Sequence, residues 1–309
     1  MQGIRIGLGL MLGQQAVIEK LVAQMREAEE LGFATAWLPN IFGADAMTIC
    51  ALAGAVTSRI EIGTAVVPTF SRHPLYMAQQ ALTTQAATGG RFTLGLGPSH
   101  KIVIEDMLGL SYAKPARHVR EYVTVLGELL EKRSTEFEGE LYRVKGSIDI
   151  ACDTKPQLLI GALGPLMRKI AGSLCDGTLT WMTGPRTLGE QVAPGVRAAA
   201  EAAGRPTPRV VAGIPICLTN DADGARAKAA KLFAMYAFLP SYKAMLDLEG
   251  ASGPADVAII GDEKALETGI RRFADAGATD LQAAIFPFGD DSGAEVRRTR
   301  AFLSELSRN

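Results

Sequence analysis

The stretch LLIGALGPLMRKIAG, from Leu158 to Gly172, contains a complete passage from a strand into a helix. An apolar run ends at Gly161, Gly164 and Pro165 follow, and a basic helical pattern then begins. Proline is favoured at the first position of a helix, so we expect the helix to start near Pro165. An apolar strand, a glycine-containing turn and a helix form the repeating unit of parallel α/β folds.

The same unit occurs eight times along the chain. Helical periodicity follows each apolar strand, for example over residues 15–31 and 45–57 and after Pro74. Eight units in 309 residues leave about 39 residues each, enough for a parallel crossover. Strands that are apolar throughout indicate burial on both faces. The sequence therefore predicts an α/β fold, a (β/α)8 TIM barrel with insertions, whose strands are 4–10, 34–38, 60–67, 91–97, 157–161, 177–181, 209–216 and 280–286.

Two stretches do not fit this strand–helix repeat, and we interpret them as insertions in a single barrel domain spanning residues 1–309. Residues 134–150 are typical of a short β excursion, and residues 221–260 are too long for one crossover helix. Long insertions after barrel strands commonly form lids and substrate walls.

Composition excludes several classes of protein. The net charge is −1, so no basic surface indicates nucleic-acid binding. The start of the chain lacks the pattern of a signal peptide, and no apolar run approaches the roughly 18 residues of a membrane helix. The three histidines are too separated for an HxxxH site, and the cysteines form no CxxC pair. We therefore expect a reduced cytoplasmic protein without a metal; its cysteines are Cys50, Cys152, Cys175 and Cys217.

The turn GALGPLM, residues 161–167, has the features of a phosphate cradle. The N–H groups in the first turn of a helix have no intrahelical partner, and the helix dipole adds positive charge there. Gly161 and Gly164 let an anion approach the backbone closely, and Arg168 and Lys169 add formal charge. Barrel enzymes often bind phosphate on this rim. The alternative is an ordinary left-handed turn before a helix.

Other strand ends carry weaker motifs. GLGPSHK (95–101) has lysine where a hydrolase elbow needs its second glycine, but its side chains can face an anion. The alternative there is a plain turn with a solvated lysine. GLGLMLG (7–13) resembles a dinucleotide fingerprint, yet its last spacing is one residue too long. The second strand ends in WLPN, which lacks the ribose-binding carboxylate, so a Rossmann fold is not favoured.

Several residues near strand ends have structural interpretations. Arg72 and His73 precede Pro74, and we expect them to cap a helix rather than to catalyse a reaction. His118 lies on a charged helical face and is expected to be solvated. Large apolar groups end strands six and eight, and either pair could belong to the core or face a cofactor or substrate ring. These groups are Trp181-Met182 and Phe286-Pro287-Phe288.

Five segments, taken in order, resemble the bacterial luciferase-like family of flavin- and deazaflavin-dependent oxidoreductases. GLGPSHK and GALGPLM are most similar to the branch that uses the 5-deazaflavin coenzyme F420, including methylenetetrahydromethanopterin reductase. The resemblance implies an insertion-bearing (β/α)8 barrel, often dimeric, that transfers hydride at C5 of the cofactor ring. The segments are AEELGFATAWL, IGTAVVPTFSRHP, TGGRFTLGLGPSHK, LLIGALGPLMRKIAGSLCDGTLTW and IIGDEKALETGIRRFADAGATDL.

The resemblance also implies which residues contact the cofactor. Residues 161–167 would hold its phosphate by backbone N–H groups, and residues 97–101 would line the ring and the tail. Ala65-Val66 matches the place where the family carries a non-prolyl cis peptide that bulges against the ring. The implied cofactor-binding residues are Asn40, Ala65, Val66, Gly97, Pro98, Ser99, His100, Lys101, Gly161, Ala162, Leu163, Gly164, Pro165, Leu166, Met167 and Trp181.

The chain departs from the family after the second strand, where relatives often carry an acidic residue and a histidine. Asn40 and Ile41 occupy this place, so a histidine proton donor is absent there. His100 becomes the first candidate for orienting or protonating the substrate, since a pKa near 6.5 suits that task. Lys101 and Glu105 are weaker catalytic candidates. Hydride transfer can also proceed without a protein acid, because the cofactor carries the chemistry.

The sequence thus predicts an F420-dependent oxidoreductase that exchanges hydride with a small organic substrate, most naturally as a reductase. One alternative is an FMN-dependent luciferase-like monooxygenase. Another, of a different class, is a non-catalytic flavin-binding protein. A small molecule is the expected partner, and a homodimer is the expected assembly.

Overall fold

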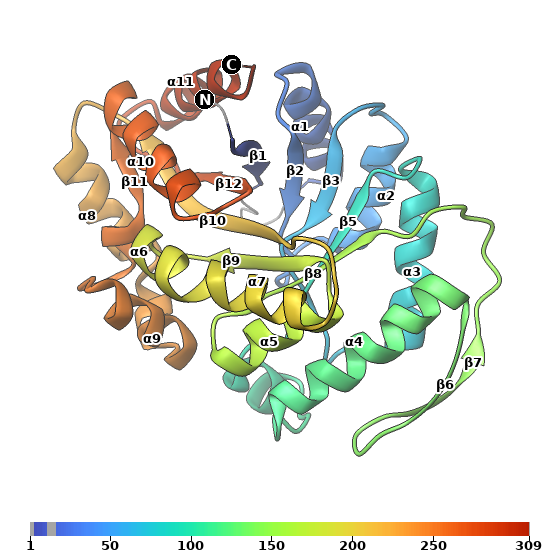
Figure 1. Ribbon diagram of the computed structural model, residues 1–309. Coiled ribbons are helices and arrows are strands. Elements are labelled where there is room, and N and C mark those ends of the chain that lie inside the picture. Colours follow the sequence, from blue (N-terminus) through green and yellow to red (C-terminus); the bar gives the residue numbers. More distant parts are fainter. Residues whose placement is uncertain (1–2, 11–16, 309) are drawn as a thin grey trace.

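The computed structural model describes residues 3–10 and 17–308 and forms a closed parallel barrel (Figure 1). Each strand pairs in parallel with its neighbours in the order β1-β2-β3-β5-β8-β9-β10-β12, and β12 pairs with β1 to close the ring. The predicted TIM barrel is confirmed. Its strands are β1 (Arg5–Gly9), β2 (Thr35–Leu38), β3 (Glu61–Thr64), β5 (Phe92–Gly97), β8 (Gln157–Ile160), β9 (Gly177–Trp181), β10 (Arg209–Leu218) and β12 (Asp280–Ile285).

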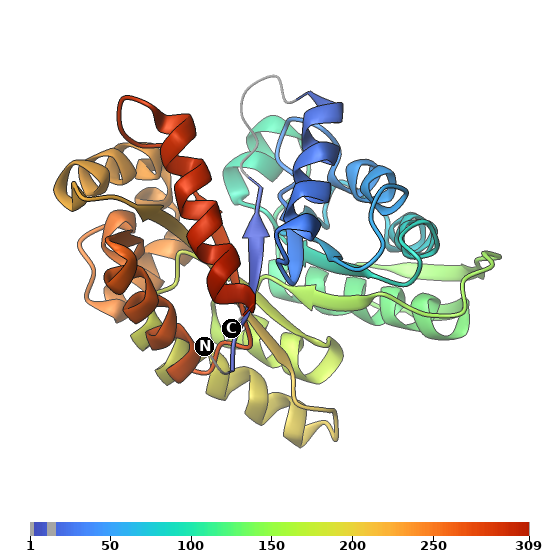
Figure 2. The same cartoon turned by 90° about the horizontal axis from the view of Figure 1, so that it is seen from above.

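Helices surround the barrel (Figure 2). Pro74 and Pro165 each open a helix, as predicted, and His73 Nδ1 accepts a hydrogen bond from the backbone N–H of Leu75 at 3.3 Å. The expected capping by His73 is therefore confirmed. The principal outer helices are α1 (Ile18–Glu30), α2 (Ala46–Gly54), α3 (Pro74–Ala87), α4 (Pro115–Lys132), α5 (Pro165–Leu174), α7 (Ala193–Ala202), α10 (Glu263–Asp275) and α11 (Ser292–Arg308).

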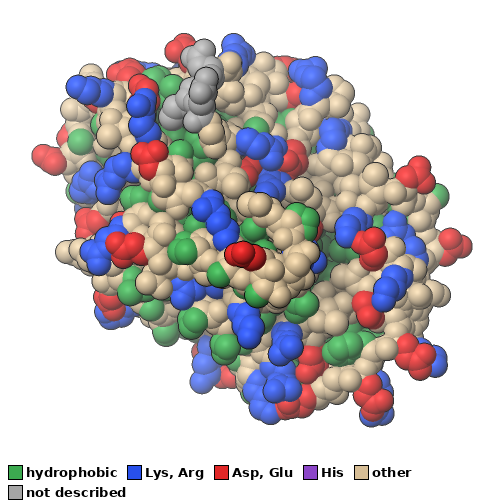
Figure 3. All heavy atoms as spheres, in the orientation of Figure 1, with side chains coloured by type: hydrophobic (Ala, Val, Ile, Leu, Met, Phe, Trp, Pro, Cys, Tyr) green, Lys and Arg blue, Asp and Glu red, His purple; other side chains and the backbone are tan. Residues whose placement is uncertain are grey.

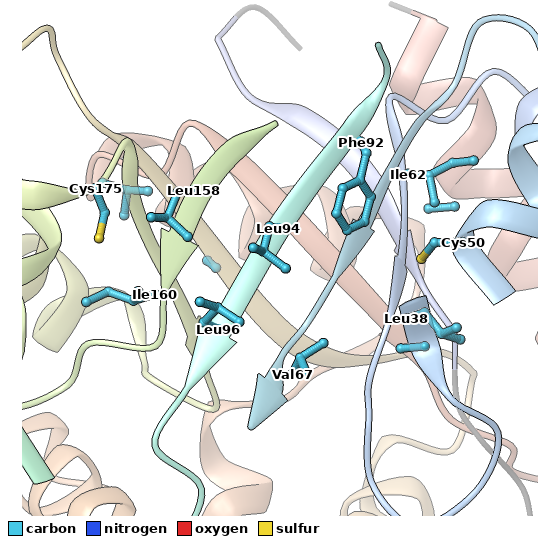
Figure 4. Close-up of a cluster of buried hydrophobic side chains, with 14 of the residues drawn as sticks. Leu38, Cys50, Ile62, Val67, Phe92, Leu94, Leu96, Leu158, Ile160 and Cys175 are labelled. Atoms are coloured by element: carbon cyan, nitrogen blue, oxygen red, sulfur yellow. The ribbon is translucent and has the colours of Figure 1, made fainter. Parts of the chain in front are cut away.

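The strands are apolar on both faces because both faces are buried. On β8, Leu158 and Ile160 point outward into the layer between strands and helices, whereas Leu159 points into the barrel. Figure 4 shows Leu158 and Ile160 beside Leu94 and Leu96 of the neighbouring strand β5. Full burial of such a side chain contributes about 1.5–3 kcal/mol, so this layer supplies much of the stability.

The inside of the barrel is filled in layers. At the amino end of the strands, the guanidinium of Arg209 pairs with Asp280 and Glu61, both at 2.7 Å. The next layer contains the fully buried Trp37 together with Leu159, Leu179 and Val211. Gly63 makes room for Trp37, because a Cβ there would lie 2.4 Å from the indole. The amino end is therefore closed, and a ligand can enter only from the carboxyl end.

The two predicted interruptions are separate structural units. Residues 134–150 contain the antiparallel hairpin β6 (Ser134–Glu138) and β7 (Arg143–Ser147), which projects from the barrel beside α4 (Figure 1). Residues 221–260 contain mostly short helices. These are α8 (Ala222–Leu232), η3 (Ala234–Phe238), α9 (Pro240–Glu249) and η4 (Pro254–Val257).

The strand predictions were wrong in two places. The predicted strand 60–67 is interrupted, since β3 ends at Thr64 and β4 (Val67–Pro68) pairs with β5 separately. Strand β11 (Ile259–Gly261) was not predicted; it forms because β10 extends to Leu218 and its last three residues pair with β11. Residues 11–13 of the GLGLMLG motif and residues 15–16 of the first predicted helix lie outside the described residues.

The prediction of a solvated His118 was wrong. Its side chain is 6% exposed, because Phe70 stacks on the imidazole with ring centroids 3.6 Å apart. The Nε2 atom lies 2.9 Å from the Thr69 hydroxyl oxygen, and Nδ1 lies 3.3 Å from that of Tyr142 in the hairpin. Burial lowers the pKa of His118 to about 4, against the opposing charge of Glu121. His118 is therefore a neutral core residue.

Charges of both signs are interspersed over the face in Figure 3, without a large basic field. This distribution agrees with the net charge of −1. None of the helices within residues 3–10 and 17–308 has the length and apolar character that a membrane crossing requires.

Candidate functional site

Two of the predicted cofactor segments lie next to each other at the carboxyl end of the barrel. Strands β5 and β8 are neighbours, and the backbone N–H of Gly161 donates to the carbonyl of Leu96 at 2.8 Å. GLGPSHK and GALGPLM therefore leave adjacent strands on one rim, and Trp181 ends the next strand, β9. Active sites of such barrels are built from these loops.

The turn between β8 and α5 presents unpaired backbone donors. Gly161 was predicted to contribute its N–H group, which is wrong because Leu96 already accepts it. Pro165 has no N–H to contribute. No described residue accepts a hydrogen bond from the other amides of the turn, which are those of Ala162, Leu163, Gly164, Leu166 and Met167.

The turn also has room for a ligand. A Cβ atom on Gly164 would meet nothing within 4 Å, so the protein's own packing does not fill this space. Gly164 has φ −76° and ψ 161°, and the left-handed alternative for this turn is therefore wrong. Arg168 is partly buried beside α7 and donates to Gln191 at 3.3 Å, and burial lowers its pKa. Free amides, the helix dipole and open space together fit a phosphate.

The neighbouring loop GLGPSHK is held in an unusual conformation. Ser99 has φ +60°, which is uncommon for a residue with a side chain. Its carbonyl accepts a hydrogen bond from the Tyr112 hydroxyl at 3.0 Å. The peptide between Ala65 and Val66 is cis, as the family resemblance implied. Val66 covers Gly97 so closely that a Cβ on this glycine would lie 2.7 Å from the valine.

The Tyr112 hydroxyl should therefore contribute to cofactor affinity indirectly. We expect Tyr112→Phe to weaken cofactor binding about fivefold, because one hydrogen bond worth about 1 kcal/mol no longer holds Ser99. Adding Ser99→Gly should restore affinity, since glycine adopts positive φ without cost. The measurement is a fluorescence titration of the four proteins of the cycle. If Ser99→Gly fails to compensate, Tyr112 does not act through Ser99.

A continuous series of aromatic rings flanks the loop. The imidazole of His100 lies 5.7 Å from the ring of Tyr242, which lies 5.0 Å from Tyr236. Trp181 lies 6.1 Å from both Tyr236 and Phe233. The insertion 221–260 thus contributes three of the five members. We call these residues the aromatic wall: His100, Trp181, Phe233, Tyr236 and Tyr242.

The three catalytic candidates have different surroundings. His100 is half-buried in the aromatic wall, and burial lowers its pKa below the ordinary value. Lys101 is mostly exposed, and its Nζ lies 3.5 Å from Glu105, whose carboxylate also accepts from the Tyr112 backbone. Asn40 accepts a hydrogen bond from the Ala46 backbone at 3.0 Å, which fixes the loop after β2. His100 is the candidate that joins the rest of the site.

Sequence reasoning missed Gln282, whose side chain lies inside the barrel on β12. The residue is 5% exposed, and no described residue gives its Oε1 a hydrogen bond. A polar residue in the middle of the otherwise apolar run after Asp280 in DLQAAIF was the available signal. Phe233 and Tyr236 of the aromatic wall were also not singled out from the sequence.

Metal ligation has no structural support in the part of the chain that the structure describes. No group of three or more His, Cys, Asp or Glu side chains is arranged there to hold a metal ion. The groups that line this rim are backbone donors, aromatic rings and single polar side chains.

The structure is a (β/α)8 barrel with a turn of unpaired backbone amides after its fifth main strand and an aromatic wall beside it. The luciferase-like monooxygenase family matches residues 4–295, and the chain belongs to this family.

Relatives and solved structures extend this result. The chain is 28% identical to 5,10-methylenetetrahydromethanopterin reductase from Methanopyrus kandleri over 251 residues, covering 75% of this chain and 71% of the relative. The solved structure of the coenzyme F420-dependent tetrahydromethanopterin reductase from the same organism has a TM-score of 0.81 at 23% identity, over 98% of each chain. An F420-dependent secondary alcohol dehydrogenase in complex with an F420-acetone adduct has a TM-score of 0.83 at 20% identity, over 99% and 98% of the chains. At these identities the two structures establish the fold alone.

Proposed function

We propose that the protein is an F420-dependent oxidoreductase that transfers hydride between the 5-deazaflavin coenzyme and a small organic substrate and acts as a reductase. The observation that carries the proposal is the turn of free amides between β8 and α5, with open space beside Gly164. The solved reductase from Methanopyrus kandleri and the secondary alcohol dehydrogenase are both described as F420-dependent, which supports the choice of coenzyme.

Each part of the site has a role in this proposal. The amides of residues 162–164 and 166–167 would hold the phosphate of the coenzyme. Val66 and Trp181 would contact its ring, and the loop 97–101 would line the ring and the tail. The bound deazaflavin supplies the hydride chemistry, so the chain needs only to bind, orient and shield the reactants.

The rim of the barrel suits an organic substrate with apolar surface. Large apolar side chains are exposed on the segments that follow several strands. Exposed apolar groups that gather in one region often mark a binding site. Phe238 of η3 is 83% exposed and lies two residues from Tyr236 of the aromatic wall. Other exposed members of these loops are Ile41, Phe42, Ile102, Met107 and Leu166.

His100→Ala should leave coenzyme affinity nearly unchanged and slow turnover by about tenfold or more, because a positioned acid or base contributes at least this much. Burial lowers the pKa of His100 and so favours its neutral imidazole. Turnover that needs the neutral ring should therefore fall as the pH drops through that pKa. The measurement is kcat against pH for both proteins. Equal profiles would remove His100 from the chemistry.

The main alternative is an FMN-dependent luciferase-like monooxygenase, because the same turn fits the ribityl phosphate of FMN. A non-catalytic flavin-binding protein is the alternative of a different class. The expected homodimer and the expected absence of nucleic-acid partners stay predictions.

Titration of the purified protein with F420 and with FMN, followed by fluorescence, separates the first two proposals. We expect F420 to bind and its absorbance to change on turnover with an alcohol or carbonyl substrate. Tight FMN binding without F420 binding would replace the first proposal by the monooxygenase. Binding of a cofactor without any hydride exchange or oxygen consumption would favour the non-catalytic protein.

A further inference from the structure

Gln282 lies where a polar side chain is unusual, in the middle of an apolar strand and inside the barrel. Its neighbours in register on the flanking strands are Gly7 of β1 and Gly213 of β10. A Cβ on Gly213 would lie 2.9 Å from Gln282 Oε1, and one on Gly9 would lie 3.1 Å from Gln282 Cγ. Glycines on both sides therefore give this long side chain the space that it occupies.

The side-chain carbonyl of Gln282 is buried without a hydrogen-bond partner. The residue is 5% exposed, and no described residue satisfies Oε1. A buried carbonyl without a hydrogen-bond partner costs free energy. Such a group in a folded protein therefore calls for an explanation, and a bound ligand that donates to it is one.

The surroundings of Gln282 belong to the site rather than to the closed end of the barrel. Gly213 is in register with Trp181, and a Cβ on Gly213 would lie 3.1 Å from the Trp181 ring. The indole Nε1 of Trp181 is also buried without a hydrogen bond. Burial raises the pKa of Tyr236, and the nearby indole N–H of Trp181 lowers it. The two side chains lie close together, but their geometry does not meet the criteria for a hydrogen bond.

An amide side chain offers one acceptor and two donors in a plane. Its complement is a planar –CO–NH– group, which both flavins and deazaflavins carry at the edge of the pyrimidinedione ring. We propose that Gln282 recognises this edge, with Oε1 accepting from the ring N–H and Nε2 donating to a ring carbonyl. This inference rests on the proposed function and adds a contact at the opposite end of the cofactor from the phosphate turn.

Gln282→Met tests the inference, because methionine has a similar length and no polar atoms. We expect the apparent affinity for F420, measured by fluorescence, to fall about tenfold, because the –CO–NH– edge of the bound ring loses its hydrogen-bond partner. The thermal midpoint of the protein without cofactor should stay unchanged or rise, because an unpaired carbonyl is removed. These opposite effects on binding and stability distinguish cofactor recognition from a structural role.

Gln85 provides a matched control. It is also buried, but its Nε2 donates to Thr154 and to the carbonyl of Lys155, and its Oε1 accepts from the Phe92 backbone. Gln85→Met should therefore lower the thermal midpoint and leave the affinity for F420 unchanged.

A derivative of F420 methylated at ring N3 identifies the contacted group. The wild type should bind the derivative about tenfold more weakly than F420, whereas Gln282→Met should bind both alike. An unchanged F420 affinity in Gln282→Met, or a raised KM for the organic substrate alone, would overturn the inference. A wild type that binds neither F420 nor FMN would instead overturn the proposed function, and this inference with it.

Discussion

Gly164→Asp should abolish most of the affinity for the cofactor while leaving the protein folded. A carboxylate at this position would lie in the turn that holds the phosphate, and two like charges about 4 Å apart repel by about 4 kcal/mol at a partly screened site. Allowing for relaxation, we expect a loss on the order of 100-fold in affinity. Isothermal titration with F420 or FMN measures it.

The stability of this variant should not fall. Gly164 is the residue that precedes the first turn of α5, and its φ of −76° and ψ of 161° suit aspartate, a favourable helix cap. Gly164→Ala, which adds a methyl group in open space, should bind almost as the wild type does. Gly164→Asn caps the helix without a charge and should be intermediate. If the aspartate variant binds the cofactor normally, the phosphate does not lie in this turn.

Arg209→Met should be the most destabilising single change inside the barrel. Arg209 is 13% exposed and pairs with Asp280, which is 3% exposed, and with Glu61. Removing it leaves two carboxylates buried without their cation, which costs about 3–5 kcal/mol. Chemical denaturation measures the loss. Arg271→Met, which breaks an exposed pair with Glu267, should change stability little by comparison.

The same ion network makes stability depend on pH. Burial alone would raise the pKa of Glu61, but Arg209, Arg5 and a hydrogen bond from Thr93 together lower it. A lowered folded-state pKa contributes stability above the ordinary carboxyl pKa, and this contribution is lost as the pH falls through the folded value. The deficit of Arg209→Met should therefore be largest near neutral pH and shrink under acid conditions. A deficit that grows on acidification would contradict the ion-pair explanation.

The barrel was predictable from sequence because each repeat carries its own local signals. The run from Leu158 to Gly172 contains a buried strand, a turn and a proline at the first helical position, and the structure has the same units there. His118 was not predictable in this way. Its burial depends on Phe70 and on Tyr142 of the β6/β7 hairpin, and contacts across such sequence distances leave no periodic signal.

The same distinction between local signals and long-range contacts applies to the site. The unpaired amides of the turn between β8 and α5 could be anticipated, because they are backbone groups fixed by local chain geometry. The pairing of Gly161 with Leu96 could not, since it depends on which strands become neighbours. Gln282 was overlooked because its surroundings are formed by Gly213 and Trp181, which lie on other strands. Site residues whose surroundings depend on contacts between strands can be identified only from the structure.

The most direct test of the account is the affinity of the wild-type protein for F420 against the affinity for its phosphate-free deazaflavin nucleoside. Several amide donors to one charged group predict that the nucleoside binds at least about 100-fold more weakly. Gly164→Asp should then bind the two ligands almost equally. Equal affinity of the wild type for both ligands would contradict the assignment of the turn between β8 and α5 as the phosphate site.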